Sequence, residues 1–323
     1  PHYLSRRSGD EFICTLERYP SFEALRQSLE DVFRRVAVPM RLSSGETLQV
    51  SFSVGAIRHA AGEAVTLREL LVGAGTALQA AKEMGRAQIC WHSPALAQRR
   101  KRRLRVEQRL RNAIEQGALV PYYQPELDMR DGRIVVFEAL ARWTDEQLGE
   151  VSPAEFIPVA EETGLISAIT ELMFRKVLAD LPTLRRHFPA VKVAFNTSPG
   201  LLEKEGVFAL LAELNTSHPG LCEALELEIT ETHLASVSTA FMAQLQSIIG
   251  LGVQVAIDDF GTGYSSLSRL AAMPVHRLKI DASFVASIHQ ESYRRVVQSI
   301  LSLSRALGLE ATAEGVETEA QRS

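Results

Sequence analysis

Six side chains that offer oxygen ligands to metals, and one lysine, fall within or directly after short apolar runs of the sequence. They are Glu138, Asn196, Glu228, Asp258, Asp259, Glu314 and Lys279. A buried carboxylate without a partner is energetically costly, so a group of them requires compensating positive charge. Oxygen ligands without histidine favour Mg²⁺ or Mn²⁺ over zinc. The pattern therefore predicts a site for hard divalent cations.

The pair Asp258-Asp259 carries a further meaning because it stands at the end of one apolar run. Neighbouring residues of a strand face opposite ways, but a turn of the backbone at the strand end brings both side chains to one site. One carboxylate would then bridge two metals, which together activate water and stabilise the leaving oxygen of a phosphodiester. Lys279 would hold the water or neutralise charge in the transition state.

Each of these residues also has a purely structural explanation when it is considered alone. Glu138 and Lys279 fit ion pairs, and Asn196 and Asp258-Asp259 precede residues that favour turns. Their repetition at equivalent positions of successive strands is not expected from those explanations and favours a shared site.

The elements that position these side chains alternate between strands and helices from about Ala118 onward. Apolar runs predict buried strands at residues 119–127, 134–141, 191–196, 224–230, 253–258, 277–280 and 310–314. Helical patterns lie between most of them, at residues 153–163, 168–188, 200–215, 236–250, 265–272 and 292–307. This alternation predicts a parallel barrel or a doubly wound sheet, and the functional residues of a barrel lie at the carboxyl ends of its strands.

Composition divides the chain into three predicted parts. Residues 1–93 are typical of an α/β domain, with strands at 11–16 and 48–57 and helices at 21–36 and 66–84. Residues 94–112 form a basic linker helix, and its arginines favour a solvated connector over a nucleic-acid patch. Residues 113–323 form the barrel.

Bulk properties narrow the class of protein. The formal net charge of −4 argues against a general nucleic-acid-binding protein. Three widely spaced cysteines without metal-ligand spacing favour a reducing cytoplasm. No apolar run is long enough to span a membrane. Because the sequence starts without Met, we expect an upstream sensory domain, and membrane attachment through such a segment stays open.

Short motifs recur in a fixed order from Arg105 to the end of the chain. They are Tyr123-Gln124-Pro125, Glu138-Ala139-Leu140-Ala141-Arg142-Trp143, Phe156-Ile157-Pro158 with Glu161, Asn196-Thr197-Ser198-Pro199, Glu228-Ile229-Thr230-Glu231, Asp258-Asp259-Phe260-Gly261-Thr262-Gly263-Tyr264-Ser265-Ser266-Leu267, Lys279-Ile280-Asp281 and Glu314-Gly315-Val316-Glu317. In this order they closely resemble EAL-type cyclic di-GMP phosphodiesterase domains. The resemblance implies a (β/α)8-type, TIM-like barrel whose first strand is antiparallel, and hydrolysis of cyclic di-GMP to linear pGpG with two Mg²⁺ or Mn²⁺ ions.

The resemblance also implies roles for single residues. The ligands of the first metal would be Glu138, Asn196, Glu228 and Asp258. The ligands of the second metal would be Asp258, Asp259 and Glu314. Lys279 would contact the nucleophilic water, and Glu317 would support the polar network. Gln124, Arg142 and Asp281 would bind the substrate. Glu231 would anchor the loop 259–266, which links the site to a homodimer interface of the barrel.

Two departures from the EAL pattern are visible. Ala141 replaces a larger apolar residue, which is a minor change. The sequence given ends at Ser323, so we expect a barrel without its last strand and without a substrate-side glutamine.

The first part of the chain contains Ser8-Gly9-Asp10-Glu11-Phe12, Phe52-Ser53-Val54-Gly55, Ala81-Lys82 and Gly85-Arg86. These segments resemble the second half of a GGDEF, or diguanylate cyclase, domain. The resemblance implies a metal ligand at Glu11 and triphosphate contacts at Lys82 and Arg86. Four positions depart from the pattern of that family: Ser8, Gly75, Gln79 and His2. A regulatory, GTP-sensing domain is therefore an alternative to a cyclase.

Three functions follow from these resemblances. The first is a cyclic di-GMP phosphodiesterase, which the complete metal set favours. The second is a receptor that binds cyclic di-GMP without hydrolysis, and the third is a bifunctional cyclase and phosphodiesterase.

Overall fold

The computed structural model describes residues 2–16, 21–36, 38–59, 64–197, 202, 205–231, 238–263, 270 and 273–322. The chain forms two compact units, Pro1–Leu104 and Arg105–Ser323. Among the described residues, no helix combines the length and hydrophobicity that a membrane crossing requires.

The N-terminal unit contains small sheets and two helices of its own. Its elements are β1 (His2–Ser8), β2 (Glu11–Leu16), α1 (Phe22–Val36), β3 (Met40–Arg41), β4 (Thr47–Leu48), β5 (Val54–Ala56), α2 (Leu67–Glu83) and β6 (Ile89–Trp91). Strands β1 and β2 form an antiparallel hairpin, and β5 pairs with β6 in parallel. Gly55 permits β5 to approach α2, because a Cβ there would lie 2.1 Å from the backbone nitrogen of Leu78.

One strand predicted for this unit is wrong. The prediction placed a continuous strand at residues 48–57, whereas β4 ends at Leu48 and β5 begins at Val54. The two pieces pair with different partners, since β4 pairs with β3 and β5 with β6. Apolar residues therefore alternate along all of residues 48–57, although the two ends of this segment pair with different strands.

Helix α3 (Pro94–Glu115) precedes the barrel and packs on it through its second half. Val106, Leu110 and Ala113 are buried there in a cluster with Trp143. The Nε of Arg109 lies 2.6 Å from Oδ2 of Asp145 at the end of β8.

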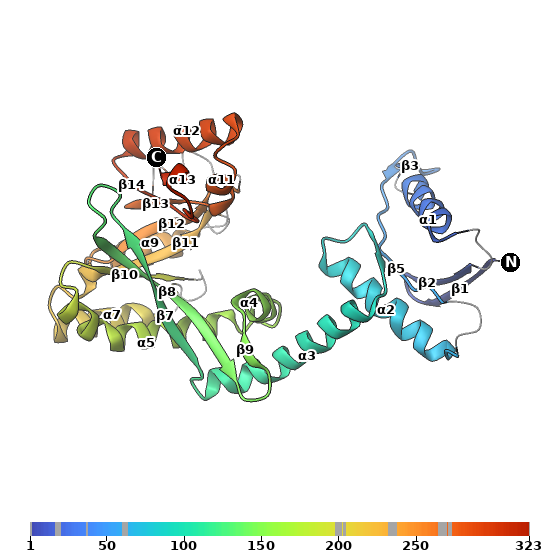
Figure 1. Cartoon of the computed structure of the whole chain (residues 1–323), viewed down its shortest axis with the longest axis horizontal. Coiled ribbons are helices and arrows are strands. Elements are labelled where there is room, and N and C mark those ends of the chain that lie inside the picture. The colour runs from blue at the N-terminus through green and yellow to red at the C-terminus, as the bar shows by residue number, and fades with distance from the viewer. Residues whose placement is uncertain are drawn as a thin grey trace. The chain divides into compact units, whose positions relative to one another are not determined.

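The second unit is built on one curled sheet (Figure 1). Its strands are β7 (Leu119–Leu127), β8 (Ile134–Asp145), β9 (Gly149–Val151), β10 (Lys192–Asn196), β11 (Leu225–Thr230), β12 (Gln254–Phe260), β13 (Arg277–Ile280) and β14 (Glu310–Ala313). Their order is β14-β13-β12-β11-β10-β8-β7, with the short β9 paired to β8. Strand β7 is antiparallel to β8, and the ladders from β8 through β10 to β14 are parallel. The seven strands predicted from apolar runs, and the antiparallel first strand, are confirmed.

Helices connect the strands and cover the outer face of the sheet (Figure 1). They are α4 (Pro153–Glu162), α5 (Ile166–His187), α7 (Glu205–Ser217), α9 (Thr239–Ile249), α11 (Ala282–Ala286), α12 (Glu291–Leu307) and α13 (Glu319–Arg322), with a 3-10 turn at Cys222–Ala224. The main core lies between them and the strands, where Phe174 of α5 packs against Phe195 of β10. The helix predicted at residues 265–272 lies almost entirely outside the described residues.

The inner face of the sheet carries buried charge. Arg277 of β13 is only 4% exposed, and its guanidinium lies 2.9 Å from Glu126, 2.9 Å from Glu310 and 3.5 Å from Glu226. Glu126 belongs to β7 at one edge of the sheet, whereas β13 lies next to the other edge. The pair Arg277–Glu126 therefore joins strands that share no ladder and holds the sheet in its curl.

This arrangement predicts a large loss of stability when the cation is removed. Replacing Arg277 with methionine leaves buried carboxyl groups without compensation, and breaking a buried ion pair costs about 3–5 kcal/mol. We expect the free energy of unfolding of the barrel to fall by that amount, measured by Trp143 fluorescence in urea in a Trp91→Phe background. The control is Arg175→Met, whose partner Glu171 is at the surface, and the expected loss is below about 1 kcal/mol. Equal losses of stability in the two variants would contradict the role of Arg277 in holding the curl of the sheet.

Candidate functional site

The ammonium group of Lys279 lies at the centre of the acidic residues singled out in the sequence. Its Nζ is 2.7 Å from Oε1 of Glu228 and 2.8 Å from Oε1 of Glu314. The nearest oxygens of Glu138 and Asp258 each lie 3.3 Å away. Parallel strands bring these residues together from β8, β11, β12, β13 and the segment after β14.

Burial gives the site its electrostatic character. Lys279 is 1% exposed and Glu228 is likewise buried. Burial alone would lower the pKa of Lys279, but the surrounding carboxylates, Glu228 foremost, outweigh it and raise that pKa. Burial raises the pKa of Glu228 well above its usual value, and it raises the pKa of Glu314 to about 7. A carboxylate is therefore protonated more readily here than in water unless further positive charge is bound.

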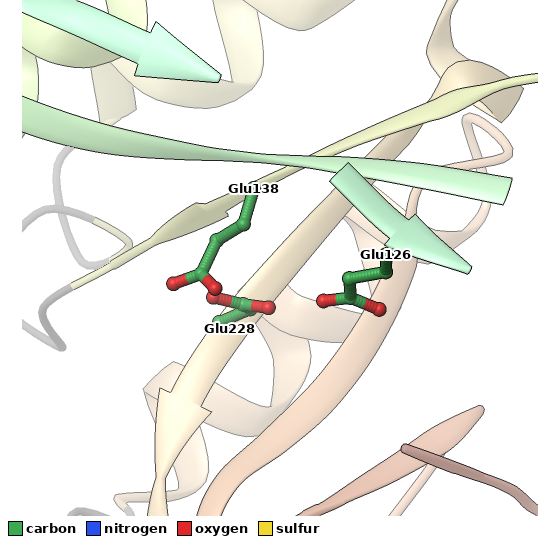
Figure 2. Close-up of side chains that lie close together, drawn as sticks. All are labelled: Glu126, Glu138 and Glu228. Carbon is green, nitrogen blue, oxygen red and sulfur yellow. The ribbon is translucent and has the colours of Figure 1, made fainter. Parts of the chain in front are cut away.

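Three carboxyl groups meet at one side of this centre. Figure 2 shows Glu138 and Glu228 with their carboxyl groups close together and Glu126 beside them. One oxygen from each of the three lies within 4.8 Å of the others. Asn196 closes the group from β10, since its Nδ2 donates to Oε1 of Glu138 at 3.1 Å.

A second group of three forms where β12 ends. Ligand oxygens of Asp258, Asp259 and Glu314 lie within 4.8 Å of one another. Asp259 has a left-handed backbone with φ of 54°, and the register between β12 and β13 shifts between Ile257 and Phe260. Such a bulge redirects a side chain, and Asp tolerates this conformation better than most residues. Both carboxylates of the pair therefore reach one place, as the sequence analysis expected.

The loop after β12 is held by a carboxylate from the neighbouring strand end. Glu231 accepts hydrogen bonds from the backbone N–H of Gly261 at 2.8 Å and of Gly263 at 3.1 Å. This is the contact expected of the loop anchor predicted at Glu231. Residues 264–266 of the predicted loop lie outside the described residues.

The other predicted site residues take different places. Gln124 on β7 stands directly opposite Glu138, and Arg142 lies further along β8. Asp281 caps α11 by accepting from the backbone N–H of Ser283 at 3.0 Å. Glu317 is exposed, and within the described part of the chain its carboxylate forms no hydrogen bond or ion pair with the clustered acids. The strand register therefore places Gln124 beside Glu138 of the cluster.

The candidate residues of the N-terminal unit do not gather around one centre as those of the barrel do. Glu11 pairs with Arg7 at 3.3 Å on the β1–β2 hairpin. Arg86 follows α2 with a positive φ of 60°, and its backbone N–H donates to the carbonyl of Ala81. Lys82 lies in the last turn of α2. Among the described residues, these three side chains form no common hydrogen-bonded or ion-paired group.

The sequence analysis missed Glu126, which lies within reach of Glu138 and Glu228. A signal was present, because Glu126 follows Gln124 by two residues and strand alternation puts both on one face. Its partner Arg277 is 151 residues away, however, and sequence spacing alone gives no reason to pair them.

Comparison with known families agrees with this geometry. The family model of the EAL domain matches residues 107–323, and that of the diguanylate cyclase GGDEF domain matches residues 2–88. The two resemblances noted in the sequence are thus confirmed.

Curated relatives align with almost all of the chain. Cyclic di-GMP phosphodiesterase PdeR of Escherichia coli is 35% identical over 323 residues, which are 98% of this chain and 47% of PdeR. The bifunctional diguanylate cyclase/cyclic di-GMP phosphodiesterase MucR of Pseudomonas aeruginosa is 33% identical over 327 residues, 99% of this chain and 46% of MucR. The chain thus spans less than half the length of either relative.

Solved structures give the same result for the barrel. A MucR phosphodiesterase structure in complex with c-di-GMP is 34% identical, covers 68% of this chain and 89% of its own, and has a TM-score of 0.61. Since the EAL model covers the barrel and α3 from residue 107 to the end, and this solved relative shares the barrel, the chain belongs to the EAL domain family.

Proposed function

We propose that the barrel hydrolyses cyclic di-GMP to linear pGpG with two Mg²⁺ or Mn²⁺ ions. The observation that carries the proposal is the convergence of four carboxyl groups on one buried ammonium, with a fifth, that of Asp259, beside two of them. EAL-family relatives that are named cyclic di-GMP phosphodiesterases support the choice of substrate. A receptor without catalysis gains nothing from such a costly group, because a binding site can be built from neutral donors.

The charges of the site fit two divalent cations. The acids at the centre are Glu138, Glu228, Asp258, Asp259 and Glu314. When all are ionised, the single charge of Lys279 leaves four carboxylates uncompensated, which matches the charge of two divalent ions. Oε2 of Glu228 is buried and has no hydrogen-bond donor among the described residues, whereas Oε1 of Glu228 and the buried Oδ1 of Asp258 share the single ammonium of Lys279. These buried oxygens, in a set of proposed ligands that offers neither sulfur nor imidazole nitrogen, suit hard cations.

The proposed ligands are those that the resemblance assigns. Glu138, Asn196, Glu228 and Asp258 would hold one ion, and Asp258, Asp259 and Glu314 would hold the other. Bound ions would polarise the phosphodiester and lower the pKa of the attacking water. Lys279 would orient that water and neutralise charge in the transition state.

The predicted site residues that are not metal ligands bind the substrate or support the site in this proposal. Arg142 would take a phosphate, and Gln124 and Asp281 would contact the dinucleotide from either side of the acids. Glu231 would keep the loop after β12 in place through its two backbone hydrogen bonds. The homodimer, the upstream sensory domain, the cytoplasmic location and the role of the GGDEF segment stay predictions.

The first test is turnover of cyclic di-GMP by the chain with Mn²⁺ or Mg²⁺, resolved by chromatography. We expect metal-dependent formation of pGpG, abolished by EDTA. Glu138→Ala should lower turnover by on the order of 100-fold or more, because even indirect disturbance of a metal site costs about 10- to 100-fold. The control Glu146→Ala changes an exposed acid beyond the end of the same strand and should retain full activity. A folded protein that binds the dinucleotide without turnover would support the receptor instead.

A second test removes the central cation. In the metal-free protein, Lys279→Met leaves the buried acids uncompensated, and we expect the free energy of unfolding to fall by about 3–5 kcal/mol. Saturating Mn²⁺ should restore most of this loss, because it binds only the folded protein. The control is Lys176→Met, whose ammonium donates to the carbonyl of Gly117 at 2.6 Å. If Mn²⁺ stabilises both variants to the same extent, Lys279 does not share its carboxylates with metal.

A third test uses pH. In the metal-free protein, burial raises the pKa of Glu314 from 4.5 to about 7. Between these values the folded protein holds a proton that the unfolded chain has lost. The stabilisation from this proton is therefore complete below pH 4.5 and is lost as the pH rises through about 7.

We accordingly expect the free energy of unfolding in EDTA to decrease between about pH 5 and pH 8. Mn²⁺ should reverse the decrease at the upper end, because metal takes the place of the proton. Urea unfolding across this range measures the effect. Glu314→Gln should show a smaller decrease, and an undiminished decrease in that variant would assign the proton elsewhere.

A further inference from the structure

An exposed aromatic side chain lies on β7, two residues before the residue that pairs with Glu138. Tyr122 of β7 is 63% exposed, which is unusual for a large ring in the middle of a paired strand. It lies directly opposite Leu140, and two residues further along β7 Gln124 lies opposite Glu138. Tyr122 is therefore one step beyond the acids, towards the carboxyl end of β8.

The neighbouring residue shows which face Tyr122 occupies. The hydroxyl of Tyr123 donates to Oδ2 of Asp180 on α5 at 2.7 Å, so Tyr123 faces the outer helices. Successive residues of a strand point to opposite faces. Tyr122 therefore faces the inner side of the sheet, which it shares with Gln124 and Glu126.

A cation lies against the ring of Tyr122. The guanidinium carbon of Arg142 is 5.9 Å from the ring centroid, within the range of a cation–π contact. Arg142 also donates from Nη1 to the carbonyl of Ala141 at 3.0 Å. In the described part of the chain no carboxylate pairs with Arg142, so its charge is available to an anionic ligand.

An open aromatic face beside an unpaired guanidinium suits a ligand that joins a planar base to a phosphate. We propose that Tyr122 stacks on one base of the cyclic dinucleotide while Arg142 takes the adjoining phosphate, and that this stacking favours purines over pyrimidines. The inference rests on the proposed function for its substrate class. It adds a specificity-determining residue to the site, because a purine offers more ring area to stack on than a pyrimidine does.

The test measures binding in EDTA, where metal-dependent hydrolysis cannot proceed. Tyr122→Ala should raise the dissociation constant for cyclic di-GMP by about 10-fold, the scale of one lost base–aromatic stack. Tyr122→Phe keeps the ring and should bind within about 2-fold of the wild type. The control Leu127→Ala removes a side chain that is 56% exposed at the other end of β7, and should leave binding unchanged.

Cyclic di-UMP separates stacking from a mere positioning of Arg142. If Tyr122 stacks on a base, the preference for cyclic di-GMP over cyclic di-UMP should shrink in Tyr122→Ala. If the ring only holds Arg142, both dinucleotides lose affinity equally and Tyr122→Ala adds nothing in an Arg142→Ala background. Either that result, or unchanged binding by Tyr122→Ala, would overturn the inference.

The outcome is independent of the phosphodiesterase test. Weaker binding by Tyr122→Ala in a protein that never turns over cyclic di-GMP would uphold the stacking role and refute the proposed reaction. Normal turnover with unchanged specificity in Tyr122→Ala would uphold the proposed reaction and refute the stacking role.

Discussion

The buried ammonium of Lys279 is the interaction on which the rest of the barrel interior depends. Carboxyl groups from β8, β11 and β12, and from the segment after β14, converge on it within 3.3 Å. Without a shared cation, each of these strands would have to bury an acid alone, at a cost that burial of its apolar neighbours would not readily offset. The same convergence that makes the site costly to fold makes it suited to divalent ions, since it concentrates oxygen ligands where water is largely excluded.

The charge inside the sheet is arranged in two tiers. Arg277 and Lys279 are two residues apart on β13, so alternation places both on the inner face. Glu226 and Glu228 repeat this spacing on β11, one beside each cation. The run Leu-Glu-Leu-Glu of β11 thus resembles a half-exposed strand, yet all four residues are buried. Its leucines pack in the outer core, and its glutamates form part of the inner charge.

The sequence indicated the strands and the central acids because both depend on local patterns. Apolar runs marked every strand of the main ladder, and polar residues interrupting them marked the site. Features that depend on the curl of the sheet were missed. The pairing of Glu126 with Arg277 exists only because the sheet curls, and the break within residues 48–57 reflects a change of ladder partner. Periodicity records which face a residue occupies and carries no information about what lies across from it.

Distance and charge give different answers about which acids form the metal site. By distance, Glu126 belongs with Glu138 and Glu228. By charge it belongs with Arg277 and not with Lys279, because its Oε2 lies 2.9 Å from Nη1 of Arg277. A carboxylate that has a guanidinium partner is a weaker ligand than Glu228, whose Oε2 has no hydrogen-bond donor among the described residues and whose Oε1 shares one ammonium with three other acids. The ion pair of Arg277 and Glu126 therefore holds the sheet in its curl, and it leaves the acids around Lys279 to the proposed ions.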